Sequence, residues 1–191
     1  MKLAEKRDDK ATFSRKMNIF EKNDEMETPL IFSKDENSAT VYMMKIFNSP
    51  VDRIWNHFTQ GPLLDLWWAP LPWKCETKEI SFVPGGFWKY AMISPEDEQS
   101  NRIAKFNEIN HHRSFDYLDY FTDKEGKINT ALPVTKSLIG FTGVEEGTKL
   151  TINIHFNSAA EMKQVLEMGM QQRLGTALSQ LEQHIKEEDR I

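Results

Sequence analysis

Six consecutive segments alternate apolar and polar residues with a period of two. They read CETKEISF (75–82), GFWKYAMIS (86–94), NRIAKFNEI (101–109), RSFDYLDYF (113–121), VTKSLIGFTGV (134–144) and KLTINIHF (149–156). This period is typical of β-strands that bury one face. Turns rich in Gly, Pro, Asn and Asp separate the segments, and short connections join antiparallel neighbours. The pattern therefore predicts one antiparallel sheet.

Helical patterns lie on both sides of these strands. Residues 29–47 contain two apolar runs around the turn residues KDEN, as in a hairpin, and residues 51–59 and 63–68 have helical spacing. After the last strand, Ser158 and Glu161 form a capping-box motif that opens one long helix. We expect an α+β fold: a curved antiparallel sheet of about seven strands, wrapped on a long C-terminal helix, with two short helices after the first strand.

The stretch LWWAPLPW at residues 66–73 carries three of the five tryptophans, and its two prolines exclude a regular helix or central strand. A single helix is about 10 Å wide and cannot fill the concave side of a broad, twisted sheet. The space that remains is either filled by large side chains or left open as a cavity. We expect Trp68 to point beneath the long helix, Trp67 to cover the preceding helical turn, and Trp73 to lead into the next strand.

The length of 191 residues suits one domain, which we place at 28–191 after an arm at 1–27 that is weakly helical or mobile. The net charge is −5 and both signs are mixed along the chain, which argues against a nucleic-acid partner or a polybasic membrane anchor. No run approaches the roughly 18 apolar residues of a membrane span. Since the N-terminus has no secretory signal pattern and the single cysteine excludes an internal disulfide, we expect a cytoplasmic protein.

Several of these motifs occur together in one known family. The helix NSPVDRIWNHFT, the turn LLDLWWAP, the hairpin VPGGFWKYAM and the final strand and helix resemble the activator of heat-shock protein 90 ATPase homologue family, within the START-like helix-grip (SRPBCC) superfamily. The resemblance covers about residues 30–186 and implies a helix-grip fold with a ligand cavity between the sheet and the last helix. This chain has Ala69 where the family often has Gly, which stiffens the turn. It has Arg173-Leu174 where a Gly-Trp pair is common, so the cavity would be larger and more polar here.

The family name does not by itself imply a chaperone partner. In the eukaryotic co-chaperone, activation of the ATPase depends on a separate N-terminal domain. The 27 residues before the expected domain are too few for one, because a domain needs at least about 50 residues. We therefore expect no chaperone partner.

The sequence contains little recognisable catalytic chemistry. It has no glycine-rich phosphate loop, Cys75 has no cysteine partner, and none of the five histidines pairs with another at a metal-binding spacing, so we expect no cofactor and no metal site. His155 and Glu108 are weak catalytic candidates. The alternation of the last strand places His155 opposite its apolar face, and we expect Glu108 and Asp119 to lie on the outer face as well.

The aromatic and apolar residues of the turn, the strands and the last helix are the candidate ligand-binding set. It comprises Trp68, Trp73, Trp88, Tyr90, Met92, Tyr117, Phe141, Met162, Leu166 and Arg173. A glycine in the middle of a helix costs roughly 1 kcal/mol relative to alanine, so Gly169 predicts the close approach of a bulky group. The alternative is that these side chains fill the core and leave no cavity of the usual ~300–1,000 Å³.

Three functions fit this pattern. The favoured one is a protein that binds a small hydrophobic or amphipathic molecule in the cavity. The second is an enzyme of the cyclase, dehydratase or hydrolase kind, which would need an ionisable group such as His155, Glu108 or Arg173 in that cavity. The third is an interaction protein, including one with a stress or chaperone role, that exposes Trp67, Trp68 and Trp73 as a patch. The pattern leaves open whether the chain is a monomer or a homodimer.

Overall fold

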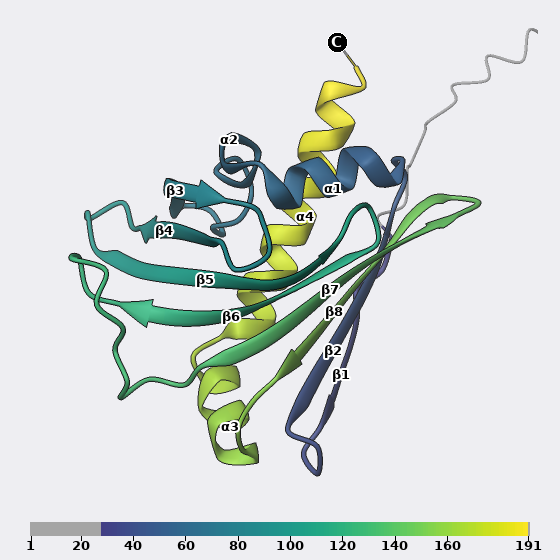
Figure 1. Ribbon diagram of the computed structural model, residues 1–191. Helices are drawn as coiled ribbons and strands as arrows, with labels where there is room; N and C mark the ends of the chain where they lie inside the picture. The colour runs from purple at the N-terminus through teal and green to yellow at the C-terminus, as the bar shows by residue number, and fades with distance from the viewer. Residues whose placement is uncertain (1–27, 191) are drawn as a thin grey trace, which may run out of the picture.

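Eight strands form one antiparallel sheet in the order β1-β2-β8-β7-β6-β5-β4-β3 (Figure 1). The computed structural model describes residues 28–190, so the arm expected at 1–27 lies outside the described residues. The strands are β1 (Ile31–Asp35), β2 (Thr40–Phe47), β3 (Lys74–Ser81), β4 (Phe87–Ile93), β5 (Gln99–Asn110), β6 (Ser114–Thr122), β7 (Thr135–Val144) and β8 (Gly147–His155).

The six segments with a period of two are confirmed as strands β3 to β8, and every boundary lies within two residues of its predicted position. The sheet has eight strands and not about seven, because both apolar runs of residues 29–47 pair as the hairpin β1–β2, with Ile31 opposite Met44. Alternation also decides the buried face. On β8, Leu150, Ile152 and Ile154 are buried, whereas Thr151 and Asn153 are only partly covered.

Four helices complete the described fold: α1 (Val51–Thr59), α2 (Gly61–Leu64), α3 (Ala159–Glu167) and α4 (Met170–Glu188). Helix α4 crosses the sheet on its concave side, with α1 and α2 near its C-terminal end and α3 at the opposite end (Figure 1). The buried residues of α4 include Ala177, Leu178, Leu181 and Ile185, which belong to the hydrophobic core.

The single long helix expected at the C-terminus is wrong in one respect, because it is broken at Gly169. This residue has a φ of 84°, a left-handed conformation that suits glycine, and it separates α3 from α4. A Cβ at this position would meet only Gln172 Oε1, at 4.0 Å. The glycine is thus explained by backbone conformation and not by a bulky neighbour. The capping box is confirmed, since Glu161 N donates to Ser158 Oγ at 3.1 Å.

A buried ion pair joins the concave face of the sheet to α4. Lys45 Nζ on β2 lies 2.7 Å from Glu182 Oε2 on the helix, and only 3% of the Lys45 side chain is exposed. Lys45 also donates to Thr28 O at 2.6 Å, and Glu182 Oε1 lies 3.3 Å from Lys186 Nζ. This network fixes the position of α4 across the strands and therefore the shape of the space beneath it.

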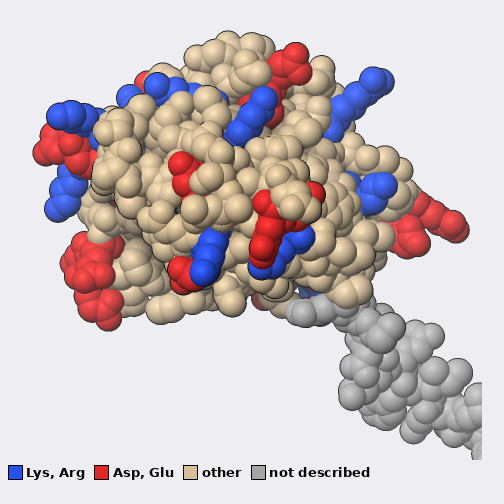
Figure 2. Space-filling model, turned by 90° about the horizontal axis from the view of Figure 1, so that it is seen from below, with Lys and Arg blue, Asp and Glu red and all other residues tan. Residues whose placement is uncertain are grey.

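Acidic and basic side chains are scattered over the face seen in Figure 2, with no broad basic patch. This distribution agrees with the mixed charges of the sequence on that face. Among the helices of residues 28–190, none has the length and apolar character that crossing a bilayer requires.

Candidate ligand cavity

A cavity of about 90 Å³ lies between the concave face of the sheet, the tryptophan turn and the α3–α4 junction. The turn contributes Trp68 and Pro70, β4 contributes Tyr90 and Met92, and α4 contributes Met170 and Arg173. The volume is well below the ~300–1,000 Å³ typical of ligand pockets, so large side chains fill most of the space that the sheet encloses.

Hydrogen bonds from α4 hold the tryptophan turn in place. Gln180 Nε2 donates to Trp67 O at 3.0 Å and to Ala69 O at 2.8 Å, and Leu71 N donates to Gln180 Oε1 at 2.7 Å. Because the prolines prevent regular secondary structure, one glutamine side chain satisfies backbone groups that a helix or strand would have paired.

The three indoles of the turn point in different directions. Trp67 is 1% exposed, and its Nε1 donates to His57 O at 3.1 Å. Trp68 faces the cavity, with its ring centroid 5.2 Å from that of Trp88 and 6.3 Å from that of Tyr90. Trp73 is half-buried against the core immediately before β3. This arrangement agrees with the directions expected from the sequence.

Charged groups form one wall of the cavity. Arg102 on β5 and Asp119 on β6 form an ion pair between an Nη and Oδ2, and the Arg102 guanidinium lies 3.9 Å from the centroid of the Phe121 ring. Asp119 Oδ1 and Arg102 Nε have no hydrogen-bond partner among residues 28–190. Buried polar atoms are nearly always paired, so these two atoms are exceptions to that rule.

Burial dominates the protonation equilibria at this wall. It raises the pKa of the Asp119 carboxyl, against the opposing effect of the Arg102 charge. Burial also raises the pKa of the Tyr90 and Tyr117 hydroxyls, and the nearby charge of Asp119 adds to this effect. Across the cavity, burial and then repulsion by Arg102 lower the pKa of Arg173. Two guanidiniums and one carboxylate therefore line the same cavity.

The structure brings together half of the expected ligand-binding set. Trp68, Tyr90, Met92, Tyr117 and Arg173 line the cavity. The other five, Trp73, Trp88, Phe141, Met162 and Leu166, pack in or against the core without lining this cavity.

The two weak catalytic candidates lie on the outer face of the sheet. His155 and Glu108 line a hollow of about 480 Å³ together with Asp116 and Lys136, and both are exposed. The expectation that Asp119 also lies on the outer face is wrong. Asp119 is 7% exposed and lines the concave cavity.

Sequence reasoning missed Arg102 entirely, although its signal was present. Arg102 lies on the same face of β5 as Ala104 and Phe106. Asp119 lies on the same face of β6 as Phe115 and Tyr117. Each charged residue therefore interrupts the apolar face of its strand. Two opposite charges at apolar-face positions of neighbouring strands predict a buried ion pair.

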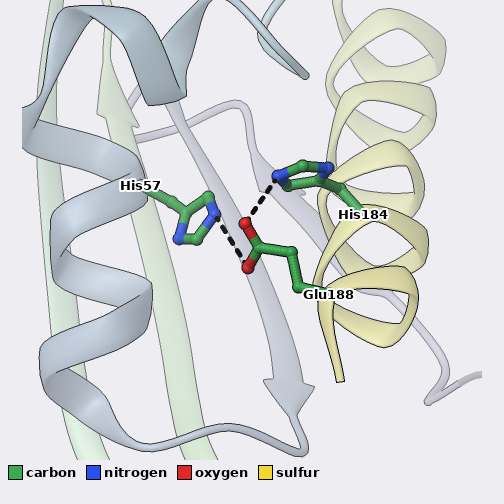
Figure 3. A group of neighbouring side chains, drawn as sticks. All are labelled: His57, His184 and Glu188. Atoms are coloured by element: carbon green, nitrogen blue, oxygen red, sulfur yellow. Dashed lines mark ion pairs between the residues drawn. The ribbon is translucent and has the colours of Figure 1, made fainter. Parts of the chain in front are cut away.

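A second group of polar side chains lies outside the cavity, where α1 meets the end of α4. His57, His184 and Glu188 place their side-chain nitrogen and oxygen atoms within 4.8 Å of one another (Figure 3). Local spacing gave no sign of this cluster, because His57 is far from the other two residues along the chain.

Residues 48–186 match the family described as activator of Hsp90 ATPase homolog 1-like protein. The chain belongs to this family. Several solved structures are similar to it along most of its length. Protein Ms6760 from Mycobacterium smegmatis is 28% identical with a TM-score of 0.75, over 81% of this chain and 95% of that one.

Two further structures extend the comparison. A protein from Arthrobacter aurescens is 26% identical with a TM-score of 0.76, over 80% of this chain and 88% of that one. The AHSA1 protein from Silicibacter pomeroyi is 14% identical with a TM-score of 0.64, over 78% of this chain and 99% of that one. At this identity the similarity supports a shared fold only. The comparison with curated proteins gives no match. The helix-grip architecture expected from the motifs is thereby confirmed.

Proposed function

We propose that this Hsp90-activator-like protein binds a small amphipathic acid in the cavity beneath α4. The observation that carries the proposal is the charged wall: Arg102 and Asp119 line the cavity, and their atoms Nε and Oδ1 have no hydrogen-bond partner within residues 28–190. Leaving a buried polar group unsatisfied costs about 1–3 kcal/mol. A ligand that supplied the missing hydrogen bonds would recover this free energy.

The charges of the wall determine which ligand chemistry fits. Arg102 and Arg173 carry two positive charges toward the cavity, and Asp119 compensates one of them. A carboxylate placed between the guanidiniums would balance the other, and arginine recognises carboxylates through paired hydrogen bonds. The aromatic and thioether side chains of Trp68, Tyr90 and Met92 suit an apolar body, so the ligand is an amphipathic acid and not a purely hydrophobic molecule.

The size of the cavity restricts how the ligand lies. A volume of about 90 Å³ accommodates only a few heavy atoms, which suits the acidic head and the first carbons. The longer apolar part would leave past Met168 and Met170, which line the cavity on either side of the break at Gly169. Methionine side chains adapt easily to different shapes, so we expect Met168 and Met170 to change conformation when the ligand binds.

The test compares hexanoate and decanoate with hexanol and decanol on the full-length protein, by thermal shift and isothermal titration calorimetry. We expect the acids to raise the melting temperature and the alcohols to do so much less. Arg173→Gln should weaken acid binding at least tenfold, whereas Arg113→Gln, at an exposed position in the β5–β6 turn, should leave it unchanged.

Three results would overturn this proposal. Equal melting-temperature shifts with acids and alcohols would show that the acidic head group is not recognised. The absence of any shift would show that the cavity does not bind these molecules. Binding that depends on Arg113 and not on Arg173 would place the ligand elsewhere.

The other two functions have weaker support. An enzyme needs an ionisable group in the cavity that can transfer protons. Asp119 is a carboxylate that lines the cavity, whereas His155 and Glu108 lie on the outer face of the sheet. An interaction protein needs exposed indoles, but Trp67 is buried, and Trp68 and Trp73 are half-buried. Neither observation favours these functions over binding.

A further inference from the structure

Two imidazoles and one carboxylate converge where α1 packs beside the last turns of α4. His57 lies on α1, and His184 and Glu188 lie one turn apart on α4, with the carboxylate between the two rings (Figure 3). Glu188 Oε1 is 3.1 Å from His184 Nε2, and Glu188 Oε2 is 4.0 Å from His57 Nε2. Both rings therefore turn the same nitrogen toward one carboxylate.

The orientation of the His57 ring is set by its other nitrogen. Nδ1 lies 2.9 Å from Arg53 O, and because a carbonyl can only accept, Nδ1 carries the hydrogen. The Nε2 lone pair then points at the cluster. This nitrogen has no hydrogen-bond partner among residues 28–190, and only 3% of the side chain is exposed. A histidine that donates through Nδ1 to a backbone carbonyl, with Nε2 free, has the form found in metal-binding histidines.

We propose that His57, His184 and Glu188 bind a divalent transition-metal ion, with Zn²⁺ the best fit to this ligand set. Two imidazole nitrogens and a carboxylate oxygen are common zinc ligands, at bond lengths of about 2.0–2.2 Å. Tetrahedral donors at such bond lengths lie about 3.3 Å apart. The ligand atoms lie within 4.8 Å of one another, with the two carboxylate oxygens 3.1 and 4.0 Å from the two imidazoles, so shifts of roughly 1.5 Å or less bring the donors to that value.

The surroundings supply the remaining requirements of such a site. Arg53 donates to Glu188 Oε2 at 2.7 Å and to Asp189 Oδ1 at 2.5 Å, which orients the carboxylate as outer hydrogen bonds do around metals. The side chains of His184 and Glu188 are 27% and 39% exposed, so an ion can enter from solvent. Three protein ligands leave the fourth position for water. The ion would join α1 to the C-terminal end of α4 and so strengthen the contact between the two helices.

The experiment uses the full-length protein without a histidine tag, stripped with EDTA and titrated with Zn²⁺ by calorimetry. Co²⁺ serves as a spectroscopic probe of the ligands. We expect one ion per chain and a tetrahedral cobalt spectrum without a thiolate charge-transfer band, which excludes Cys75 as a ligand. His184→Gln and Glu188→Gln should each weaken binding at least tenfold. These positions are partly exposed, so the variants should keep their fold, which circular dichroism verifies.

The matched control is the pair His111 and His112, whose rings lie 4.2 Å apart in the exposed β5–β6 turn. A variant with both residues changed to Gln should bind Zn²⁺ as the unchanged protein does, and Zn²⁺ should raise the melting temperature of both. The proposal is overturned if the unchanged protein binds no Zn²⁺, if His184→Gln leaves affinity intact, or if the control variant loses binding.

Discussion

Removing Glu182 should destabilise the protein far more than removing Lys45, although the two form one ion pair. In Glu182→Leu the Lys45 ammonium stays buried, 3% exposed, and keeps the hydrogen bond to Thr28 O and the Phe47 ring at 5.9 Å, neither of which carries a negative charge. Leaving a buried charge uncompensated costs about 3–5 kcal/mol. Lys45→Met leaves Glu182 beside Lys186 Nζ at 3.3 Å, so the carboxylate keeps a cation. We expect this second variant to lose only about 1–3 kcal/mol.

The double variant Lys45→Met/Glu182→Leu should recover most of the loss, because replacing a whole buried pair by apolar side chains is often neutral or stabilising. Urea unfolding followed by tryptophan fluorescence measures all four proteins. At about 2–4 °C per kcal/mol for a chain of this size, Glu182→Leu should also melt about 6–20 °C lower. Equal losses in the two single variants would refute the claim that Lys186 compensates Glu182. No recovery in the double variant would refute the claim that the loss comes from an uncompensated buried charge.

Three further predictions concern single residues. Cys75 is buried, which raises its pKa far above the usual range, so Ellman's reagent at pH 8 should find no thiol in the native protein and one after unfolding in guanidinium. Gly169→Ala forces alanine into a left-handed conformation and should cost about 1–2 kcal/mol, whereas Gly175→Ala inside α4 should stabilise by up to about 1 kcal/mol, both read from thermal melts. Burial raises the pKa of Asp116, but hydrogen bonds from Glu108 N and other neighbours outweigh it, so the folded pKa is lowered. The carboxylate thus stabilises the fold above about pH 3.9, and Asp116→Asn should lose about 1–3 kcal/mol at pH 7, a difference that shrinks as the pH falls through the folded pKa.

Local patterns predicted the sheet because each strand carries its own signal. Alternation of buried and exposed residues is a property of a few neighbouring positions, and β3 to β8 show it clearly. The break at Gly169 was not predicted, because apolar residues keep helical spacing on both sides of it, from Met162 in α3 to Leu181 in α4. A glycine in the left-handed conformation does not alter that spacing.

The site was predicted only in part, because its chemistry depends on contacts between distant segments. The aromatic walls at Trp68 and Tyr90 follow from motifs and alternation. Interrupted alternation marks Arg102 and Asp119 one by one, but their contact also depends on the β5–β6 register, in which Arg102 lies opposite Phe121. His57 meets His184 only through the packing of α1 beside α4. Spacing rules that look for ligands close in sequence miss such sets.

The two buried ion pairs of the concave face differ in a way that separates stability from function. Each oxygen of Glu182 lies within 3.3 Å of an ammonium group, and neither Lys45 nor Glu182 lines the cavity. Asp119 keeps Oδ1 without a hydrogen-bond partner among residues 28–190, and its pair borders a cavity. Replacing Arg102 and Asp119 together by Met and Leu should therefore leave the free energy of unfolding unchanged or raise it, while abolishing acid binding. A large loss of stability in this double variant would show that the Arg102–Asp119 pair stabilises the fold and does not serve a ligand.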